Sequence, residues 1–241
     1  MKTLDDYLYY HEDGPPTIDI YCGDCLEVMP MIDLVDLVIT SPPYNLGNGH
    51  HTGGIKINPY EDNLTEEEYQ RFQLAVLDQV DAILANDGNV FYNHKTRIKD
   101  GGLIHPLEWL RKSTLTLKQE LIWIQGSQNF DPCRFFPMTE RIYWLAKEKT
   151  CTVNNRKYKD YFQWNPVGIN GKHDRQFPIE MPKTWMDVLP QAEIIFDPFL
   201  GSGTTLVACK ELKRNGIGIE INDKYCEIAK KRLQNTQVPF L

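Results

Sequence analysis

A strand–loop–helix–strand unit near the end of the chain constrains the fold most. Residues 194–197 form a short apolar run, a loop with two glycines follows, and a helical pattern over 204–213 leads into a second strand at 216–221. Such a unit places its two strands parallel, with the helix on one face of the sheet. Strands and helices alternate earlier in the chain as well. The sequence therefore predicts an α/β fold with a mostly parallel sheet flanked by helices on both faces.

The other elements follow from apolar runs separated by turn signals. We expect strands at 18–22, 34–40, 89–93, 118–124 and 140–147, and helices at 25–31, 65–84, 103–113, 181–189 and 223–233. Residues 47–63 begin with a glycine-rich stretch and are expected to form a mobile loop. Residues 150–176 show little periodicity and are expected to form an irregular appendage. One domain, residues 1–241, accommodates the whole pattern.

Composition agrees with this class of protein. The chain has 241 residues, of which 41% are hydrophobic and 24% charged, as in a soluble globular domain. The first residues lack the apolar core of a signal peptide, and no apolar run is long enough to span a membrane, so we expect a cytoplasmic protein without membrane association. Cys22 and Cys25 form a Cys-x-x-Cys pair. Without a second pair of ligands, no metal site is expected.

The loop of the opening unit has the features of a nucleoside-cofactor site. Asp197 ends the first strand, Gly201 and Gly203 let the backbone approach a ligand, and the helix beginning at Thr204 presents unpaired N–H groups. Glu220 ends the next strand, where a carboxylate can accept hydrogen bonds from both ribose hydroxyls. A dinucleotide site would need a further glycine three positions after Gly203, and a P-loop would need Gly-Lys-Ser/Thr. The alternative is a purely structural turn in which Glu220 caps a helix.

A second motif, Ser41-Pro42-Pro43-Tyr44, follows the apolar strand at 34–40. Neither proline can donate to a sheet, so the strand ends here and directs backbone carbonyls outward. Ser41 adds a side-chain acceptor, and Tyr44 adds an aromatic face on which a base can stack. The amino group of adenine or cytosine is a poor nucleophile because its lone pair is delocalised into the ring. Acceptors that hold its N–H groups expose that lone pair, once the base is flipped out of a duplex. The alternative is a Pro-Pro loop that only ends a strand.

At these residues the chain resembles the β group of S-adenosylmethionine-dependent DNA amino-methyltransferases, in which the catalytic motif precedes the cofactor motif. The resemblance covers about residues 18–233. It implies a Rossmann-like class I methyltransferase fold with a circularly permuted motif order, and S-adenosylmethionine as the cofactor. It implies catalysis by Ser41, Pro42, Pro43 and Tyr44. It implies cofactor binding by Asp24, which would contact the adenine amino group, and by Phe177, Asp197, Phe199, Gly201, Ser202, Gly203, Thr204 and Glu220.

The resemblance also implies direct in-line methyl transfer to an amino group, without a covalent enzyme intermediate. Ser41 stands where adenine-specific members commonly have Asp or Asn, and serine is frequent in cytosine-N4 enzymes. The β group mixes the two substrates behind this motif. N6 of adenine is slightly favoured by overall frequency, and N4 of cytosine is the alternative.

Other activities fit the sequence less well. An RNA or protein amino-methyltransferase and a catalytically silent DNA-binding regulator remain open. Pro132-Cys133 resembles the nucleophilic dipeptide of cytosine C5-methyltransferases. Those enzymes place it soon after an N-terminal cofactor motif and follow it with Glu-Asn-Val, which this chain lacks.

The net charge of −7 argues against general affinity for nucleic acid, but basic residues gather locally. Residues 150–176 combine basic and aromatic side chains and are either a short target-recognition segment or an ordinary charged loop. The run 230–232 is expected on the exposed face of the last helix. Contacts with double-stranded DNA are expected from Asn45, His50, His51, Arg156, Lys157, Lys159 and Lys172. So short a recognition segment favours a homodimer or a short target, and a cognate restriction endonuclease cannot be read from the chain.

Overall fold

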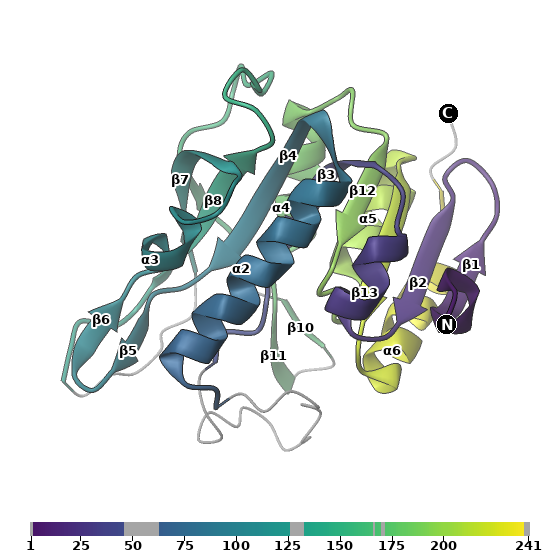
Figure 1. Ribbon diagram of the computed structural model, residues 1–241. Helices are drawn as coiled ribbons and strands as arrows, with labels where there is room; N and C mark the ends of the chain where they lie inside the picture. Colours follow the sequence, from purple (N-terminus) through teal and green to yellow (C-terminus); the bar gives the residue numbers. More distant parts are fainter. Residues whose placement is uncertain (1, 46–62, 126–132, 166, 170–171, 239–241) are drawn as a thin grey trace.

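The computed structural model describes residues 2–45, 63–125, 133–165, 167–169 and 172–238. A sheet of nine strands crosses this described part (Figure 1), in the order β1-β2-β13-β12-β3-β4-β8-β7-β9. The pairings from β2 to β4 are parallel, β1 and β8 run antiparallel to their neighbours, and β9 runs parallel to β7. The strands are β1 (Leu8–Glu12), β2 (Ile18–Cys22), β3 (Val35–Thr40), β4 (Leu84–His94), β7 (Thr116–Ile124), β8 (Thr139–Ala146), β9 (Tyr161–Gln163), β12 (Ile194–Asp197) and β13 (Asn215–Glu220).

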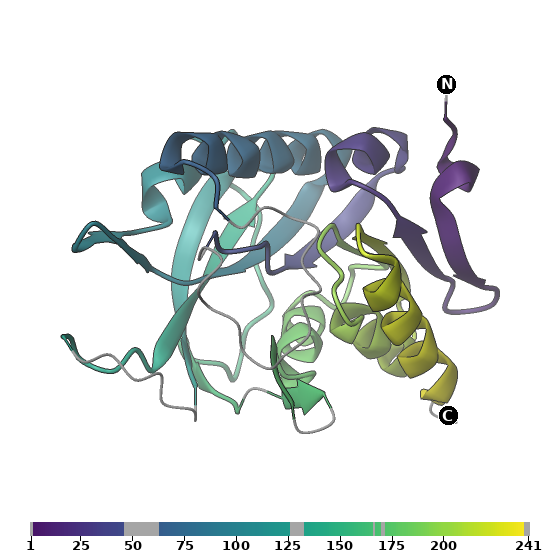
Figure 2. The ribbon, with the colours of Figure 1, turned by 90° about the horizontal axis from the view of Figure 1, so that it is seen from below.

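Helices cover both faces of this sheet, as the alternating pattern predicts. In Figure 2, α1 and α2 lie on one side of the sheet and α4, α5 and α6 lie on the other. The helices are α1 (Cys25–Val28), α2 (Glu66–Ile83), α3 (Leu107–Leu110), α4 (Glu180–Val188), α5 (Thr204–Leu212) and α6 (Asp223–Asn235), with 3-10 turns at Leu4–Tyr7 and Met29–Met31.

Each layer of helices has its own apolar core. Val38 and Val90 of the central strands pack into the core beneath α2, whereas Leu37 and Phe91 pack into the core beneath α4 and α5. The split follows from the strand itself, because successive side chains point to opposite faces of a sheet. Central strands buried on both faces therefore read as continuous apolar runs.

Helix α2 begins where the sequence predicts. The Thr65 hydroxyl accepts a hydrogen bond from the Glu68 backbone N–H (3.3 Å), and the Glu68 carboxylate accepts one from the Thr65 backbone N–H (3.0 Å). This reciprocal capping box satisfies two of the N–H groups that a helix start leaves unpaired. The chain passes directly from α2 into β4 at Leu84, so the strand starts earlier than the expected 89–93.

The expected helix over 103–113 is wrong for its first half. Two short strands, β5 (Arg97–Lys99) and β6 (Gly102–Ile104), form a hairpin there, and only α3 is helical. Asp100 and Gly101, at the turn, have φ values of 50° and 79°. An Asp-Gly pair with left-handed backbone is typical of a tight hairpin, and this local turn prevails over the apolar pattern that follows it. Strand β1 is a further element that no pattern predicted.

The segment 150–176 is more regular than expected. Strand β9 extends the main sheet, and β10 (Val167–Ile169) pairs with β11 (Lys172–Gln176) in a separate hairpin. Phe162 of β9 is buried, and its ring stacks on Trp164 at 4.6 Å and meets the edge of Trp185 at 5.1 Å. Packing of this aromatic group, rather than alternation along the chain, holds the segment against the sheet.

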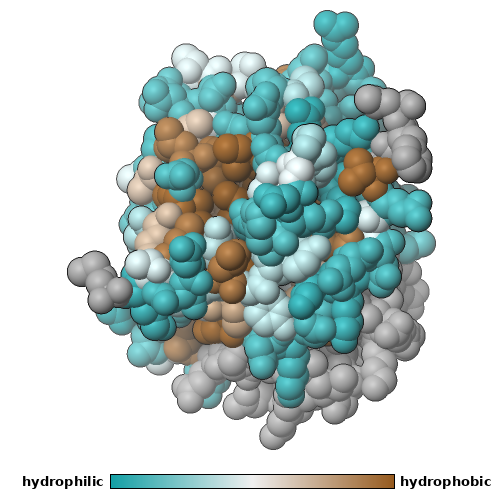
Figure 3. Space-filling view, turned by 90° about the vertical axis from the view of Figure 1, so that its right-hand side faces the viewer, coloured by the Kyte–Doolittle hydropathy of each residue, from teal (hydrophilic) through white to brown (hydrophobic). Residues whose placement is uncertain are grey.

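The outer surface at the β1 end of the sheet is uneven. Figure 3 shows apolar side chains gathered on the part of this face toward α1 and α2, with mainly polar side chains elsewhere. Leu8 of β1 is 42% exposed. None of the helices in the described part is long and apolar enough to cross a membrane.

Parallel pairing decides where a site can form. Because β2, β13, β12, β3 and β4 run in one direction, their carboxyl ends meet at the same edge of the sheet, the lower edge in Figure 1. Crevices at this edge are where open α/β sheets bind ligands. Both sequence motifs begin there, since each follows the carboxyl end of a strand.

Candidate active site

Asp197, at the end of β12, is buried and links neighbouring elements through hydrogen bonds. Its carboxylate accepts hydrogen bonds from the hydroxyls of Thr40 (2.9 Å) and Thr205 (2.6 Å) and from the backbone N–H of Phe199 (3.1 Å). The side chain is fully buried, and burial raises the pKa of Asp197 to about 6. These bonds join β3, β12 and the start of α5, so Asp197 holds both ends of the loop between β12 and α5 in place.

The glycines of this loop serve two different needs. Gly201 (φ 54°) and Gly203 (φ 86°) both adopt left-handed backbone, which side chains disfavour. A Cβ on Gly203 would lie 2.7 Å from the Cβ of Ala229, so this glycine allows α5 to approach α6 closely. A Cβ on Gly201 would meet no atom within 4 Å. The loop thus presents open space at Gly201 and tight packing at Gly203.

A side chain from the last helix holds the same loop. Arg232 of α6 donates from Nη1 to the Ser202 carbonyl (2.7 Å), the Ser202 hydroxyl (2.9 Å) and the Thr204 hydroxyl (3.1 Å). The expectation that the run 230–232 lies on an exposed face is therefore wrong for Arg232, which turns inward. Ser202 and Thr204 are themselves buried. They contribute to the loop mainly through this arginine.

Two acidic residues stand at adjacent strand ends beyond the loop. Asp24 follows β2 and accepts a hydrogen bond at Oδ1 from the Leu26 backbone N–H (2.8 Å). Glu220 ends the adjacent β13 and accepts from the backbone N–H groups of Gly201 (2.8 Å) and Asn222 (2.9 Å). The Gly23 N–H bonds to the Glu220 carbonyl (3.0 Å) and fixes the two strand ends together. Burial raises the pKa of Glu220 above its ordinary value.

The two aromatic residues expected at the cofactor are both partly exposed. Phe199 follows Asp197 and meets the ring of Phe72 edge to face, with the ring centroids 6.1 Å apart. Phe177 directly follows β11 and packs against the core on the α4 side. Each ring is anchored on one side by protein and keeps some surface available.

The tetrapeptide turns one of its carbonyls inward. The Pro43 carbonyl accepts hydrogen bonds from the Tyr69 hydroxyl (2.8 Å) and Gln73 Nε2 (3.5 Å), both on α2. The expectation that the prolines direct their carbonyls outward is therefore wrong for Pro43. α2 packs directly over the end of β3, and its polar groups need acceptors. Of the expected acceptors, the Ser41 hydroxyl and the Pro42 carbonyl remain.

Ser41 and Tyr44 belong to a polar cluster that spans three strands. The two hydroxyls are 2.8 Å apart, and the Tyr44 hydroxyl donates to Glu140 Oε2 of β8 (3.2 Å). Asn93 Nδ2 of β4 lies within hydrogen-bond distance of Tyr44 (2.8 Å), Glu140 (3.1 Å) and Ser41 (3.3 Å). Asn93 and Glu140 are both buried. Burial and the Glu140 carboxylate raise the pKa of Tyr44 well above its ordinary value.

Sequence reasoning missed Asn93 and Glu140. Each is a polar residue beside an apolar run of its strand: Asn93 directly follows residues 90–92, and Glu140 stands two positions before residues 142–146. A polar residue at the edge of such a run is the signal that could have drawn attention to them. Neither strand alone identifies a partner for its polar residue. The antiparallel pairing of β4 with β8 brings the two side chains together beside Tyr44.

A histidine supports the far side of Tyr44. The ring of His94, which ends β4, lies 4.7 Å from the ring of Tyr44. Burial lowers the pKa of His94 to about 3, so the imidazole is neutral at physiological pH. Its Nδ1 donates to the Lys95 carbonyl (2.7 Å), so its Nε2 is an acceptor. Nε2 lies 2.6 Å from the Tyr69 hydroxyl, whose one proton is shared between this nitrogen and the Pro43 carbonyl. The Tyr44 ring therefore packs against an uncharged imidazole that is held in place by its hydrogen bonds.

Of the residues expected to contact DNA, those with described side chains lie in more than one place. Asn45 stands beside the tetrapeptide, but its amide bonds both the N–H and the carbonyl of Leu64 (2.9 Å each). His50 and His51 lie outside the described residues. Lys172 lies in β11, and its side chain is not described. Arg156 is exposed, and Lys159 donates to the Tyr161 hydroxyl (3.2 Å).

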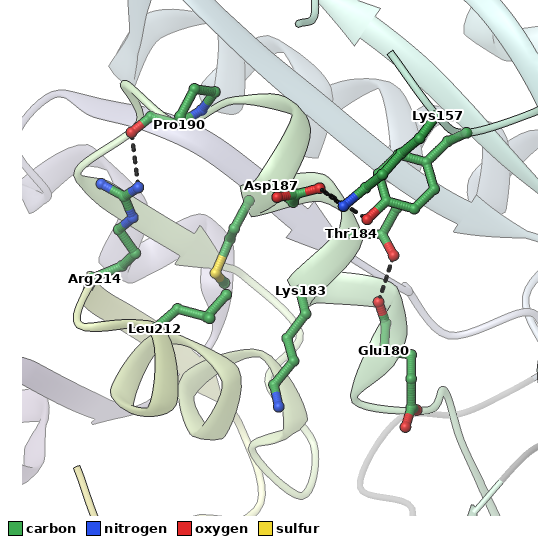
Figure 4. A pocket seen from close by; sticks show the side chains of 10 residues that line it. Lys157, Glu180, Lys183, Thr184, Asp187, Pro190, Leu212 and Arg214 are labelled. Carbon is green, nitrogen blue, oxygen red and sulfur yellow. Dashed lines mark hydrogen bonds and ion pairs between the residues drawn. The ribbon is translucent and has the colours of Figure 1, made fainter. Parts of the chain in front are cut away.

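Lys157 lies in a pocket on the α4 side (Figure 4). The pocket has a volume of about 440 Å³, and its cationic lining residues are Lys157, Lys183 and Arg214. Lys157 pairs with Asp187 (2.8 Å), Lys183 pairs with Glu211, and Arg214 donates to the Pro190 carbonyl (2.7 Å). Asp187 sits at the end of α4, shortly before the start of β12, so this pocket lies toward the sheet edge opposite the tetrapeptide.

Comparison with known families identifies the chain. Residues 35–231 match the model of the DNA methylase family, N6_N4_Mtase. The chain belongs to this family. Among curated relatives of this DNA methylase, the type II methyltransferase M.ScaI of Streptomyces caespitosus is 26% identical, over 89% of this chain and 81% of its own length. The predicted membership in a DNA amino-methyltransferase family is confirmed.

Solved structures confirm the fold class. PvuII DNA methyltransferase, described as cytosine-N4-specific, superposes with a TM-score of 0.70 at 19% identity and covers 92% of this methylase and 94% of its own chain. M1.HpyAVI, solved in complex with S-adenosylmethionine, gives a TM-score of 0.65 at 23% identity, over 90% and 98%. The mixed, mostly parallel sheet with helices on both faces is thus the class I methyltransferase fold. The circularly permuted motif order stays an interpretation.

Proposed function

We propose that this methylase transfers a methyl group from S-adenosylmethionine to the exocyclic amino group of a base flipped out of double-stranded DNA. The observation that carries the proposal is the position of Ser41. Its hydroxyl stands at the carboxyl end of β3, at the same sheet edge as Asp24 and Glu220 after β2 and β13. An acceptor for an amino group and a carboxylate pair for a nucleoside therefore share one edge.

The residues at this edge fit the proposed cofactor. Asp24 Oδ2 has no hydrogen bond within the described part of the chain, so it can accept one from an adenine amino group. Glu220 keeps acceptor capacity for ribose hydroxyls, since each carboxylate oxygen has two lone pairs and uses one on a backbone N–H. The open space at Gly201 lets a ligand approach the loop backbone. S-adenosylmethionine would supply a methyl group already activated for attack.

The protein's part in the reaction is to position and polarise the base. The Ser41 hydroxyl would accept a hydrogen bond from the target amino group, which draws the nitrogen lone pair out of conjugation. The Tyr44 ring, supported from behind by His94, would stack on the flipped base. Holding both reactants in line supplies much of the rate in such a reaction.

N6 of adenine is the slightly favoured target in this proposal, and N4 of cytosine is the alternative. The cytosine-N4-specific PvuII enzyme shares the fold, and a serine in the tetrapeptide is compatible with either base. Purified protein, S-adenosylmethionine and unmethylated duplex DNA are incubated, and the digested DNA is analysed by mass spectrometry. N6-methyladenine or N4-methylcytosine supports the proposal and names the base. Neither product, from protein that binds the cofactor, would contradict it.

The same assay distinguishes the other activities. Methylation of RNA or of a protein with unmodified DNA would support the RNA or protein amino-methyltransferase, and cofactor-independent DNA binding without any product would support a silent regulator. The DNA contacts expected from Arg156, Lys157, Lys159 and Lys172 stay predictions. So does the homodimer, which sedimentation of the free and DNA-bound protein would test.

A further inference from the structure

Glu140 is a buried carboxylate without a cation. It is 7% exposed, and no lysine, arginine or histidine of the described residues forms an ion pair with it. Its printed hydrogen bonds come from Tyr44 and Asn93, and both reach the same oxygen, Oε2. Burying an unpaired carboxylate is costly, so a position that keeps one has a use for its charge or its basicity.

In the hydrogen bonds that link Ser41, Tyr44 and Glu140, each hydroxyl donates toward Glu140. A tyrosine hydroxyl has a single proton, and that of Tyr44 is donated to Glu140. In the short contact between Ser41 and Tyr44, Ser41 must therefore be the donor. Asn93 donates its two amide protons to the nearest acceptors, the Tyr44 oxygen and Glu140 Oε2. The Tyr44 oxygen is then saturated, while the lone pairs of Ser41 remain available to a donor from outside.

The orientation of Asn93 follows from the same bonds. Turning the amide over would set its carbonyl oxygen against the Glu140 carboxylate, which is repulsive. In the orientation observed, Asn93 Oδ1 is buried and has no hydrogen-bond partner in the described part of the chain. The cluster is thus saturated toward Glu140 and keeps unused acceptors at Ser41 and Asn93, as a site for an N–H donor requires.

We propose that Glu140 receives, through Tyr44 and Ser41, the proton that the target amino group loses when it is methylated. This inference rests on the proposed function and extends it to a residue outside the tetrapeptide. Because Glu140 acts through Tyr44 and Ser41, it is a positioning residue and proton acceptor that does not itself touch the base.

The transfer balances in atoms and charge. The nitrogen lone pair forms the new N–C bond, and the C–S bond breaks with its electron pair going to sulfur, which becomes a neutral thioether. The nitrogen, now positive, passes one proton to Ser41 Oγ. Ser41 passes its own proton to the Tyr44 oxygen, and Tyr44 passes its proton to Glu140 Oε2. One positive sulfonium and one negative carboxylate are replaced by two neutral groups, and the carboxylic acid returns its proton to water after product release.

Tyr92, His94 and Lys95 lie near the hydrogen bonds that link Ser41, Tyr44 and Glu140. Tyr92 and His94 of β4 are buried; burial raises the pKa of Tyr92 and lowers that of His94, so both are neutral at physiological pH. Lys95 lies 5.4 Å above the ring of Tyr44. The raised pKa of Tyr44 keeps its hydroxyl protonated and able to relay. Glu140 is thus the carboxylate at which the hydrogen bonds from Ser41 and Tyr44 end.

The variant Glu140→Gln tests the relay, because glutamine keeps an oxygen that can accept from Tyr44 but cannot take its proton. We expect the single-turnover methylation rate at neutral pH to fall on the order of 100-fold, as for loss of a general base. The rate should recover as pH rises, since hydroxide can replace the lost acceptor. Cofactor affinity by calorimetry and DNA affinity by fluorescence anisotropy should stay at wild-type values.

Glu120→Gln is the matched control. Glu120 lies on the neighbouring β7 and pairs with Arg141 (2.9 Å), away from the cluster, so this variant should keep the wild-type rate and pH profile. Tyr44→Phe, which interrupts the relay, should add little to Glu140→Gln in the double variant. A Glu140→Gln enzyme with the wild-type rate, or one slowed equally at every pH, would overturn the relay while leaving the proposed function intact. A wild-type protein that methylates no DNA would overturn both.

Discussion

Arg232 of the last helix is bonded to the carbonyl of Ser202, 2.7 Å away in the loop between β12 and α5. The guanidinium also holds the hydroxyls of Ser202 and Thr204. A loop with two left-handed glycines has few conformational restraints of its own. The arginine replaces those restraints with charge-assisted hydrogen bonds from a separate element, in which the two protons of Nη1 are shared among three acceptors.

Replacing Arg232 with alanine should therefore loosen the loop. Hydrogen bonds to charged groups contribute about 1.5–3 kcal/mol, and we expect a loss of unfolding free energy of that order together with weaker cofactor binding. Urea denaturation and calorimetry with S-adenosylmethionine measure the two effects. Lys231→Ala is the control, because Lys231 is 67% exposed and should leave both unchanged. Equal behaviour of the two variants would show that Arg232 does not hold the loop.

The two glycines of the loop should respond differently to alanine. Gly203→Ala brings a Cβ to 2.7 Å from Ala229 and should destabilise the fold by more than the 1–2 kcal/mol that left-handed backbone alone costs. Gly201→Ala meets no neighbour, so it should cost only the backbone term while its methyl group enters the proposed cofactor space. Thermal unfolding with and without S-adenosylmethionine separates the cases. A Gly201→Ala protein that the cofactor stabilises as much as wild type would contradict this assignment.

Asp197 should make stability fall as pH rises through the weakly acidic range. Its pKa in the folded protein is raised to about 6, above the ordinary value of 3.8, so the folded state holds this proton more tightly than the unfolded state. The resulting contribution is fully present below pH 3.8 and is lost as pH rises to about 6. Its upper limit is about 3 kcal/mol. Asp197→Asn cannot titrate.

Urea denaturation of wild type and Asp197→Asn between pH 4 and about 7 measures this contribution. The stability of the wild type relative to the variant should decline across that window. A constant difference between the two proteins would show that Asp197 has no raised pKa in the folded state.

Glu220→Gln should weaken cofactor binding selectively. The amide can still accept from the Gly201 or the Asn222 N–H, but it loses the charge and one acceptor facing the proposed ribose hydroxyls. We expect a decrease in affinity for S-adenosylmethionine of at least about 10-fold, the effect of one charge-assisted hydrogen bond. Calorimetry gives the affinity, and circular dichroism checks the fold. Glu227→Gln on α6 removes a carboxylate that faces Tyr9 and Lys231 instead, and it should bind normally.

Sequence reasoning reached most of the sheet and the tetrapeptide because both depend on local signals. A strand buried on two faces, such as β3, has to be apolar throughout, and Pro42-Pro43 has to end it. The inward turn of the Pro43 carbonyl was beyond reach, since it depends on Tyr69, which lies 26 positions away on α2. Glu140 and Arg232 were missed for the same reason. Each acts on a loop that only the folded chain brings near.

The hairpin of β5 and β6 was missed although its signal is local. Its Asp-Gly turn was legible in the sequence, yet the apolar residues after it resembled a helix. Short strands carry too few alternations to outweigh such a pattern, and pairing between Arg97 and Ile104 decides the outcome.

Strand β13 lies between β2 and β12, although it is the last strand in the chain. A ribosome makes β13 after both of its neighbours, so until then the β2–β1 pair has no partner connecting it to the rest of the sheet. The edge of β2 that β13 will cover stays unpaired until then, and that of β12 stays unpaired from the synthesis of β12 until that of β13. Such edges are sites where another chain can add a strand. Ser41 and Tyr44 can find their partners early, whereas Asp24 meets Glu220 only at the end. The nascent protein can therefore complete its base-handling half before its nucleoside-binding half, which has to wait for β13.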